Sequence, residues 1–596
     1  MKSKRIVSLL LLAAMLLALL CACGSKPADT TTPDNTGDTT TPAADTSDKT
    51  NDTADNSDAE TPVDDATEAP ADNNAPQLDD AEVVAAGEGI EVDLETVELP
   101  LVDEPITLTA WRSYDPYGEW TDFNNSDWRK AVAEDTGVTV NFTTATAATA
   151  NEKFGLMLVS QDYTDLMMIP GLSALKSGDA AIEDEIVINL NDYDTSLYPH
   201  YYEFITSNSA RWKGTHTDTG NLWGFFTILK EPEGGWTGPA YRSDLAADCG
   251  WTGGDPVTLQ DWEDLLTCYR DGGIPVPLSF SYQGYYAYGM FASAFDTFPG
   301  LYAKNGTDVT YGFIDDGFKE YLTLMNKWYN EGLILSNFID WDNDHSKQAA
   351  YGMKYDNIYW GDDVAAGMSV FSFTKRQLHD SYKWNENENC YIQAVPAPVQ
   401  TEGQILHTGY TTTYVQAYPL AIAATCENME DAIRFCDFFY TKKGYLYSNY
   451  GIEGVTYNLD ENGNPVSTDV LLDSEYEYTQ QKLANWCWRI GLYTYLQSKE
   501  DFTDQTVYDA YNIWASNYDG AWAMPTGVTL TVEESEEYTS RFNDITTYMS
   551  ESIPKFITGD LNLEGDWDTF VNGVKDMGID RCLEIQTAAL ARYNAR

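Results

Sequence analysis

The side chains that most often do chemistry in enzymes are scattered along this chain without a catalytic motif. Its five histidines lie far apart, at His200, His216, His345, His379 and His407. No HExxH, GxSxG or GxxxxGK[ST] motif occurs, so the spacings that hold zinc, present a nucleophilic serine or bind phosphate are missing. The 94 acidic residues could supply a carboxylate pair for glycoside hydrolysis, but no pattern singles out two of them. We therefore expect a protein that is not an enzyme and that uses no cofactor.

One acidic segment begins like a calcium-binding loop. Asp340, Asp342 and Asp344 alternate as the first ligands of such a loop do. The sixth position is His345 instead of the glycine that the sharp turn needs, and Tyr351 stands where the last carboxylate ligand belongs. A solvated acidic turn explains this segment better than a metal site, and we expect no metal.

The cysteines do not form a framework. Of the nine, Cys21 and Cys23 stand near the N-terminus. The other seven have no CxxC spacing: Cys249, Cys268, Cys390, Cys426, Cys436, Cys487 and Cys582. An odd and scattered set favours buried free thiols over zinc ligands or a disulfide scaffold.

The N-terminus has the pattern of an export signal. Lys2, Lys4 and Arg5 precede an apolar run at residues 6–20, which is short for a membrane span. The small residue and cysteine that follow resemble the lipobox of bacterial lipoproteins, in which the cysteine becomes the diacylated N-terminus. That resemblance implies a lipid on Cys23 and a place on the outer face of the cell membrane, whereas an ordinary signal peptide would leave no anchor.

A long acidic segment follows the expected signal peptide of residues 1–22. Residues 24–104 contain 23 acidic and 2 basic residues and no aromatic one. Low hydrophobicity and charge repulsion prevent such a segment from forming a core, so residues 23–103 are predicted to be a disordered linker. Without it the chain keeps a net charge of about −38, which disfavours nucleic acid as a partner.

The remainder has the pattern of a large α/β protein. About 490 residues follow the linker, more than one hydrophobic core usually accommodates, so two lobes are expected. Strand patterns at 106–111, 138–142 and 165–169 alternate with helix patterns at 128–137 and 152–159. This βαβαβ order predicts a parallel sheet whose ligands lie outside the carboxyl ends of its strands.

Several passages resemble the family 1 extracellular solute-binding proteins. Residues 136–138 and 154–160 look like the opening of that family. Residues 241–244, followed by 256–266, are similar to its R-x-D and P-x-T-x-x-E/D-W-x-x-L passage. Residues 555–593 look like the closing helices of the large lipoprotein branch of Gram-positive bacteria, except that Leu-Ala replaces the usual Tyr-Asp before Arg-Tyr.

The resemblance implies a two-lobe, periplasmic-binding-protein-like fold of type II with a hinge between the lobes. It places the first lobe at 104–222 and 411–458, and the second lobe at 223–410 and in much of the C-terminal region. It also implies the substrate-binding component of an ABC importer, a monomer that delivers its solute to permease subunits in the membrane. Aromatic residues at helical spacing over 318–329 predict a helix in the second lobe, and residues 460–464 predict a hairpin turn.

The expected ligand is an oligosaccharide. Aromatic residues make up 13 % of the chain, and aromatic faces beside polar side chains bind the apolar and hydroxyl faces of a sugar. The resemblance maps sugar contacts onto Trp111, Arg112, Asp115, the turn Pro170-Gly171, Gln283, Tyr285, Tyr286, Phe371 and Phe373, with Trp236 and Trp360 as further candidates. Each of these side chains could instead pack in a core. Arg112 could also pair with a carboxylate, which would suit an acidic sugar or a peptide C-terminus.

Three other kinds of protein would fit the same composition. A cell-surface glycoside hydrolase or a glycan adhesin would also carry exposed aromatic side chains, and a peptide binder would also use Arg112. Turnover of a glycan would indicate the enzyme, whereas compaction on ligand binding without turnover would indicate the solute-binding protein.

Overall fold

The computed structural model describes residues 94–114, 122–171, 175–229, 237–274, 276–278, 291–340, 371–374, 392–409, 414–472, 487–493 and 505–596. The chain divides into two units, Met1–Ala71 and Asp72–Arg596, and all described residues belong to the second. The signal peptide, Cys23, the calcium-like loop after Asp340 and most of the expected linker lie outside the described residues. Within the described residues, no helix is both long and apolar enough to cross a membrane.

The first lobe is built on a six-stranded sheet with the order β13-β4-β10-β3-β1-β2. The strands are β1 Ile106–Ser113, β2 Val138–Ala145, β3 Leu166–Met168, β4 Phe225–Leu229, β10 Val415–Ile422 and β13 Leu492–Tyr493. β1 is parallel to β2 and β3, β10 is antiparallel to β3 and β4, and β13 is parallel to β4. The predicted βαβαβ order with three parallel strands is therefore confirmed, and the antiparallel β10 makes the whole sheet mixed.

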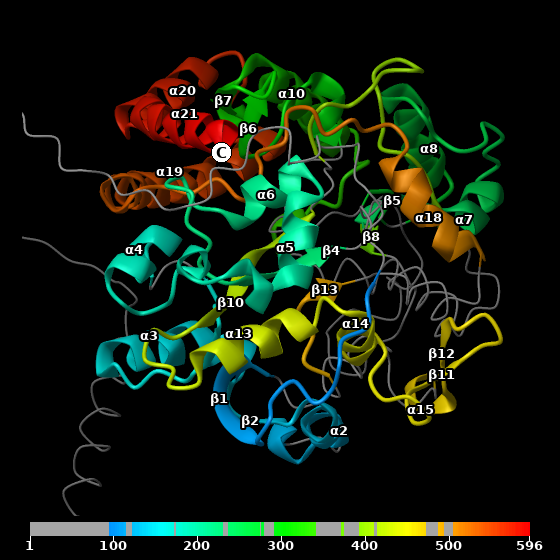
Figure 1. Ribbon diagram of the computed structural model, residues 1–596. Helices are drawn as coiled ribbons and strands as arrows, with labels where there is room; N and C mark the ends of the chain where they lie inside the picture. The colour runs from blue at the N-terminus through cyan, green and yellow to red at the C-terminus, as the bar shows by residue number, and fades with distance from the viewer. Residues whose placement is uncertain are drawn as a thin grey trace, which may run out of the picture. The chain divides into compact units, whose positions relative to one another are not determined.

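Helices cover the faces of this sheet (Figure 1). They are α2 Asp127–Thr136, α3 Ala150–Ser160, α4 Gly178–Glu183, α5 Pro199–Thr206, α6 Ser209–Thr215, α13 Met429–Phe438 and α14 Lys442–Asn449. α2 ends at Gly137, whose φ of +75° favours glycine. α14 comes from far along the chain yet packs on α2, because the indole Nε1 of Trp128 donates to the carbonyl of Tyr447 at 2.9 Å. A hairpin of β11 Tyr457–Leu459 and β12 Pro465–Ser467 follows, then α15 Asp469–Leu472, which confirms the predicted turn at 460–464.

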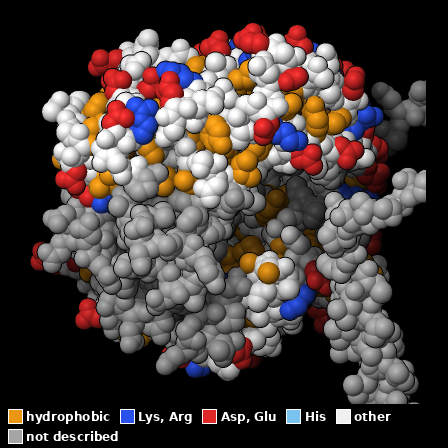
Figure 2. Space-filling model, turned by 180° about the vertical axis from the view of Figure 1, so that it is seen from behind, with side chains coloured by type: hydrophobic (Ala, Val, Ile, Leu, Met, Phe, Trp, Pro, Cys, Tyr) orange, Lys and Arg blue, Asp and Glu red, His pale blue; other side chains and the backbone are white. Residues whose placement is uncertain are grey.

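The surface carries both signs of charge, with acidic side chains in excess. Figure 2 shows Asp and Glu side chains spread over the visible face, with Lys and Arg side chains dispersed between them. Among the described residues of that face, no broad basic area gathers, in keeping with 94 acidic against 35 basic residues in the chain.

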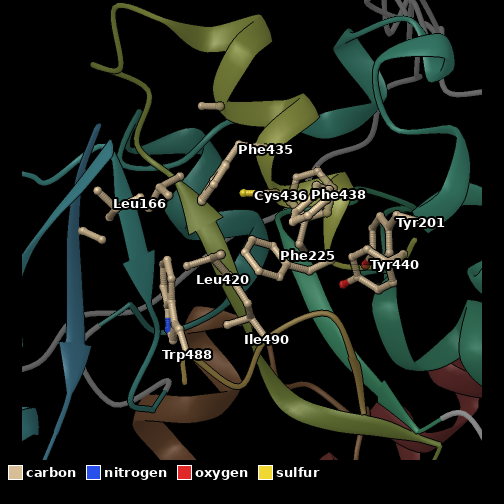
Figure 3. Packing of buried hydrophobic residues seen from close by; sticks show 14 of the residues in the cluster. Leu166, Tyr201, Phe225, Leu420, Phe435, Cys436, Phe438, Tyr440, Trp488 and Ile490 are labelled. Atoms are coloured by element: carbon tan, nitrogen blue, oxygen red, sulfur yellow. The ribbon is translucent and has the colours of Figure 1, made fainter. Parts of the chain in front are cut away.

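Side chains of the sheet alternate between two cores, one on each face. Leu108 belongs to the larger core, where Phe225, Leu420 and Trp488 also pack (Figure 3). Trp111, an odd number of positions away on the same strand, belongs to the core on the other face. Burial on both faces is what a sheet covered by helices on both sides requires.

The folded part begins earlier than the sequence analysis placed it. Leu94, Val97, Leu99 and Leu101 pack against the larger core of the first lobe. The backbone N–H of Lys442 donates to the carbonyl of Glu95 at 2.9 Å. The expected linker boundary at residue 103 is therefore wrong by about ten residues, because these apolar side chains are diluted by acidic neighbours in the composition.

The second lobe has smaller sheets and more helix. Its strands are β5 Thr237–Arg242, β8 Phe371–Thr374 and β9 Ile392–Ala394 in one antiparallel sheet of order β8-β5-β9, and β6 Leu301–Lys304 paired with β7 Asp308–Tyr311. Its helices are α7 Ser243–Asp248, α8 Leu259–Asp271, α10 Asp316–Asn330, α18 Gln505–Ala515, α19 Val532–Thr558, α20 Trp567–Asp576 and α21 Ile579–Ala595. Figure 1 shows α18, from late in the chain, beside β5.

One core joins these helices. α10 buries Phe318, Tyr321, Leu322, Met325 and Trp328, so the predicted packing of this helix in the second lobe is confirmed. α8 begins with a capping box in which Thr258 and Asp261 each accept the other's backbone N–H.

The expectation of free thiols is wrong for one pair of cysteines. Cys249 and Cys268 form a disulfide with a Cα–Cα distance of 5.7 Å, because the turn after α7 brings the first against α8, which carries the second. Cys426, Cys436, Cys487 and Cys582 are buried free thiols, as expected. Cys390 lies outside the described residues.

Candidate functional site

The carboxyl ends of five strands of the first lobe meet at one edge of its sheet. β1, β2, β3, β4 and β13 all run in the same direction, and β10, which runs the other way, begins at this edge. In open α/β sheets, ligands bind in the crevice outside the carboxyl ends of the strands. This edge is therefore the candidate ligand site.

The chain passes between the lobes at the same edge. It leaves the first lobe after β4 and again after β13, and it returns before β10. These three strands are neighbours in the order β13-β4-β10. Connections grouped at adjacent strand ends form a short line about which two lobes can rotate.

The lobe boundaries differ from those expected. β4 at Phe225–Leu229 pairs with β10 of the first lobe, so the chain crosses after residue 229 and not at 222. β13 pairs with β4 and adds residues 487–493 to the first lobe. From the sequence, the short apolar run at 225–229 could be a strand of either lobe. Only its pairing with β10 assigns it to the first lobe.

Trp111 is a core residue in the structure. It is 2 % exposed, and its ring centroid lies 5.1 Å from that of Phe154 on α3. Trp111 and Arg112 were both among the sugar contacts expected from the sequence. Consecutive residues of a strand point to opposite faces, and the structure accordingly places these two side chains in different surroundings.

Arg112 is buried at the end of β1. Its guanidinium lies 4.5 Å from the ring centroid of Phe123, and its Nη1 donates to the carbonyl of Cys487 at 3.5 Å. Burial lowers its pKa to about 10, although the nearby Tyr114 and Cys487 act in the opposite direction. Arg112 therefore stays protonated at neutral pH and brings a positive charge close to the edge where β1 ends.

The remaining predicted contacts are only partly placed. Phe371 and Phe373 lie on β8, opposite Ala240 and Gly238 of β5. The turn at Pro170 and Gly171 follows β3 at the candidate edge. Asp115, Trp236, Gln283, Tyr285, Tyr286 and Trp360 lie outside the described residues, and their roles stay predictions.

The segment before β13 contains Arg489, a candidate site residue that was not predicted from the sequence. The guanidinium carbon of Arg489 lies 4.1 Å from the ring centroid of Tyr493, the last residue of β13. Trp488 is buried beside Phe142, with ring centroids 5.0 Å apart, and so fixes the segment in the core. A Trp-Arg pair occurs here, at 111–112 and at 128–129 on α2, so this pattern does not single out Arg489.

The described part of the chain offers no metal centre. No group of three His, Cys, Asp or Glu side chains within it is arranged to hold a metal ion. The groups that it does bring to the edge are guanidinium and phenol side chains from strand ends. Such groups bind a polar ligand by hydrogen bonds and stacking.

The sequence and the fold can be compared with those of known proteins. No protein-family model matches the chain, and no curated protein does. An alginate-binding protein, AlgQ2, has a TM-score of 0.63 at 20 % identity over 83 % of this chain and 100 % of its own. A solute-binding protein for human milk oligosaccharides from Bifidobacterium longum infantis has a TM-score of 0.66 at 15 % identity, over 83 % and 99 %. The substrate-binding protein FusA of Streptococcus pneumoniae, solved with kestose, has a TM-score of 0.60 at 16 % identity, over 82 % and 100 %.

The chain has the two-lobe fold of solute-binding proteins. The expected periplasmic-binding-protein-like architecture is thereby confirmed. The lobes defined above are those of this fold, and the edge at which the chain crosses between them is the edge at which β1, β3 and β4 end.

Proposed function

We propose that the protein is the substrate-binding component of an ABC importer and that it captures an extracellular oligosaccharide between its two lobes. The observation that carries the proposal is the grouping of the three interlobe crossings at the ends of β4 and β13 and the start of β10. Such an arrangement allows hinge closure over a ligand at the same edge. The solved proteins of this fold that are named above bind alginate, milk oligosaccharides or kestose, which supports a carbohydrate ligand.

The rest of the proposal follows from the sequence. A diacyl group on Cys23 holds the protein on the outer face of the cell membrane, and the acidic segment after it serves as a tether. The protein acts as a monomer, catalyses no reaction, and passes its ligand to permease subunits in the membrane. Cys23→Ala should therefore release the protein into the medium or leave its signal peptide attached.

A ligand screen with scattering tests the binding function. Melting temperature is measured against a panel of mono- and oligosaccharides, amino acids and peptides, because a ligand that binds only the folded state raises it by mass action. For each hit, small-angle scattering should show a smaller radius of gyration and titration should show one ligand per chain. An unchanged scattering profile at saturation contradicts hinge closure, slow release of sugar would indicate a glycoside hydrolase, and a response to peptides alone would indicate a peptide binder.

A further inference from the structure

Arg489 has two donor groups that no acceptor satisfies. Its Nε and Nη2 atoms are buried and make no hydrogen bond. Among the described residues, no carboxylate forms an ion pair with it, although the chain has 94 acidic residues against 35 basic ones. An unsatisfied buried polar group requires a structural or functional reason.

The two open atoms form the edge of the guanidinium that takes carboxylates elsewhere in this chain. Arg242 directs Nε and Nη2 at the carboxylate of Asp244. Arg581 directs the same two atoms at Glu537, with Nε 3.1 Å and Nη2 3.0 Å from Oε2. A planar guanidinium edge matches the two oxygens of a carboxylate with two parallel hydrogen bonds. The edge of Arg489 is thus shaped for a carboxylate that no described residue provides.

The position of Arg489 points to the ligand site. Its guanidinium stacks on Tyr493, the residue at which β13 ends and the chain leaves for the second lobe. Arg112, at the end of β1, reaches the carbonyl of Cys487, two residues before Arg489. Both arginines act on the Cys487 thiol: burial raises its pKa to about 12, and each guanidinium opposes that rise. Two positive charges therefore lie near the edge where ligands of this fold bind.

We propose that Arg489 binds a carboxylate of the ligand and that the protein therefore recognises an acidic oligosaccharide, one that contains uronic acid or a similar carboxylated sugar. This inference rests on the proposed carbohydrate-binding function and names its substrate class. Because both donor atoms are covered in this structure, the groups that cover them must move aside before a carboxylate binds, and the ion pair then lies out of water. Charge-assisted hydrogen bonds out of water discriminate strongly against a neutral analogue.

The proposal can be tested with pairs of sugars that differ only in charge. Titration calorimetry on the full chain compares oligogalacturonates, oligomannuronates and oligoglucuronates with their methyl esters. We expect at least one acid to bind about 10- to 100-fold more tightly than its own ester, as loss of a charged hydrogen-bond pair implies. Arg489→Gln should lower the affinity for that acid by a similar factor and change the affinity for the ester by less than about twofold. Arg489→Lys should also lower the affinity for the acid, because lysine keeps the positive charge but lacks the two parallel donors of the guanidinium.

Control measurements separate this role from a structural one. Arg434→Gln on α13 removes a guanidinium that is 39 % exposed and pairs with Glu430, and it should leave both affinities unchanged. The ligand-free melting temperature of Arg489→Gln should equal or exceed that of the wild type, since the substitution removes unsatisfied buried donors. A clear fall in that temperature with unchanged affinity for acids would make Arg489 structural and overturn the proposal.

The outcomes also distinguish a failure of the acidic-ligand proposal from a failure of the proposed carbohydrate-binding function. Equal binding of acids and esters, or binding of esters and other neutral sugars alone, would overturn the acidic-ligand proposal and leave the carbohydrate function intact. If no acid and no neutral sugar binds, both proposals are wrong.

Discussion

Arg596 of the second lobe and Asp218 of the first form a largely buried ion pair, with Nη2 of the arginine 2.5 Å from Oδ1 of the aspartate. The side chains are 3 % and 12 % exposed. Arg592 on α21 approaches the same carboxylate, with its Nε 2.6 Å from Oδ2. Arg596 Nη1 also donates to the carbonyls of Lys213 and His216. The turn after α6 is therefore attached to the end of α21 by one carboxylate shared between two arginines.

Asp218→Asn should destabilise the protein strongly. The substitution leaves the Arg596 guanidinium without its carboxylate, whereas Arg592 keeps Glu534. Breaking a buried pair from one side costs about 3 to 5 kcal/mol. We expect a loss of about 2 to 4 kcal/mol in the free energy of unfolding, because the pair keeps some contact with solvent. Urea denaturation monitored by tryptophan fluorescence measures the loss.

An exposed ion pair provides the control for Asp218. Asp127 and Lys130 on α2 lie 2.8 Å apart but are 58 % and 64 % exposed. Asp127→Asn should change the free energy of unfolding by less than about 1 kcal/mol. Equal effects of the two substitutions would show that the contact between the lobes adds nothing beyond surface charge.

His216, beside this contact, should make stability depend on pH. Burial lowers its pKa from 6.5 to about 4; the Trp212 carbonyl opposes this and the charge of Arg596 adds to it. Between pH 4 and pH 6.5 the folded state therefore binds fewer protons than the unfolded state. The contribution of His216 to the free energy of unfolding is complete above pH 6.5 and is lost as the pH falls towards 4. The loss should reach about 3 kcal/mol. His216→Asn should flatten this part of the curve in denaturation series from pH 4 to 7.

His200 should show the opposite sign. Its hydrogen bond with Asp437, 2.6 Å from Nδ1, raises its pKa, although burial acts against that rise. A group whose pKa is raised by folding stabilises the protein fully below its unfolded value of 6.5, and that contribution is lost as the pH rises through the folded value. His200→Asn should therefore reduce stability more at pH 6 than at pH 9. Parallel curves for the wild type and this variant would contradict the assignment.

Trp111→Ala separates the core role from the ligand role expected from the sequence. Because Trp111 is 2 % exposed and packs on Phe154, we expect the free energy of unfolding to fall by about 3 to 5 kcal/mol. A ligand platform would instead lose about 1 to 3 kcal/mol of binding free energy with little change in melting temperature. Melting and sugar titration on the same variant decide between the two roles.

Local patterns predicted the elements of this protein well. The βαβαβ alternation and the amphipathic α10 follow from hydrophobic periodicity, which each element carries in its own sequence. The same kind of periodicity puts Trp111 and Arg112 on opposite faces of β1, because side chains alternate along a strand.

Other features depend on contacts that the sequence does not encode locally. β13 has two residues and no periodicity, so only its pairing with Ile228 and Leu229 identifies it as a strand. That Nε and Nη2 of Arg489 lack a hydrogen-bond acceptor can be found only from the three-dimensional positions of the surrounding atoms. Much of the candidate site, including Asp115 and Trp236, lies outside the described residues and stays a prediction.

The Cys249–Cys268 disulfide is another such contact, and it should stabilise the second lobe. The two cysteines are separated by 19 residues, and closing a loop of this length in the unfolded chain is worth about 3 kcal/mol. Replacing both with serine should lower the free energy of unfolding by about that amount.

The thiols of Cys426, Cys436, Cys487 and Cys582 should react with a thiol reagent only after denaturation, because all four are buried. Mass spectrometry after alkylation, with and without reduction, measures both properties. Alkylation of Cys249 or Cys268 in the native, unreduced protein would show that the bond does not form.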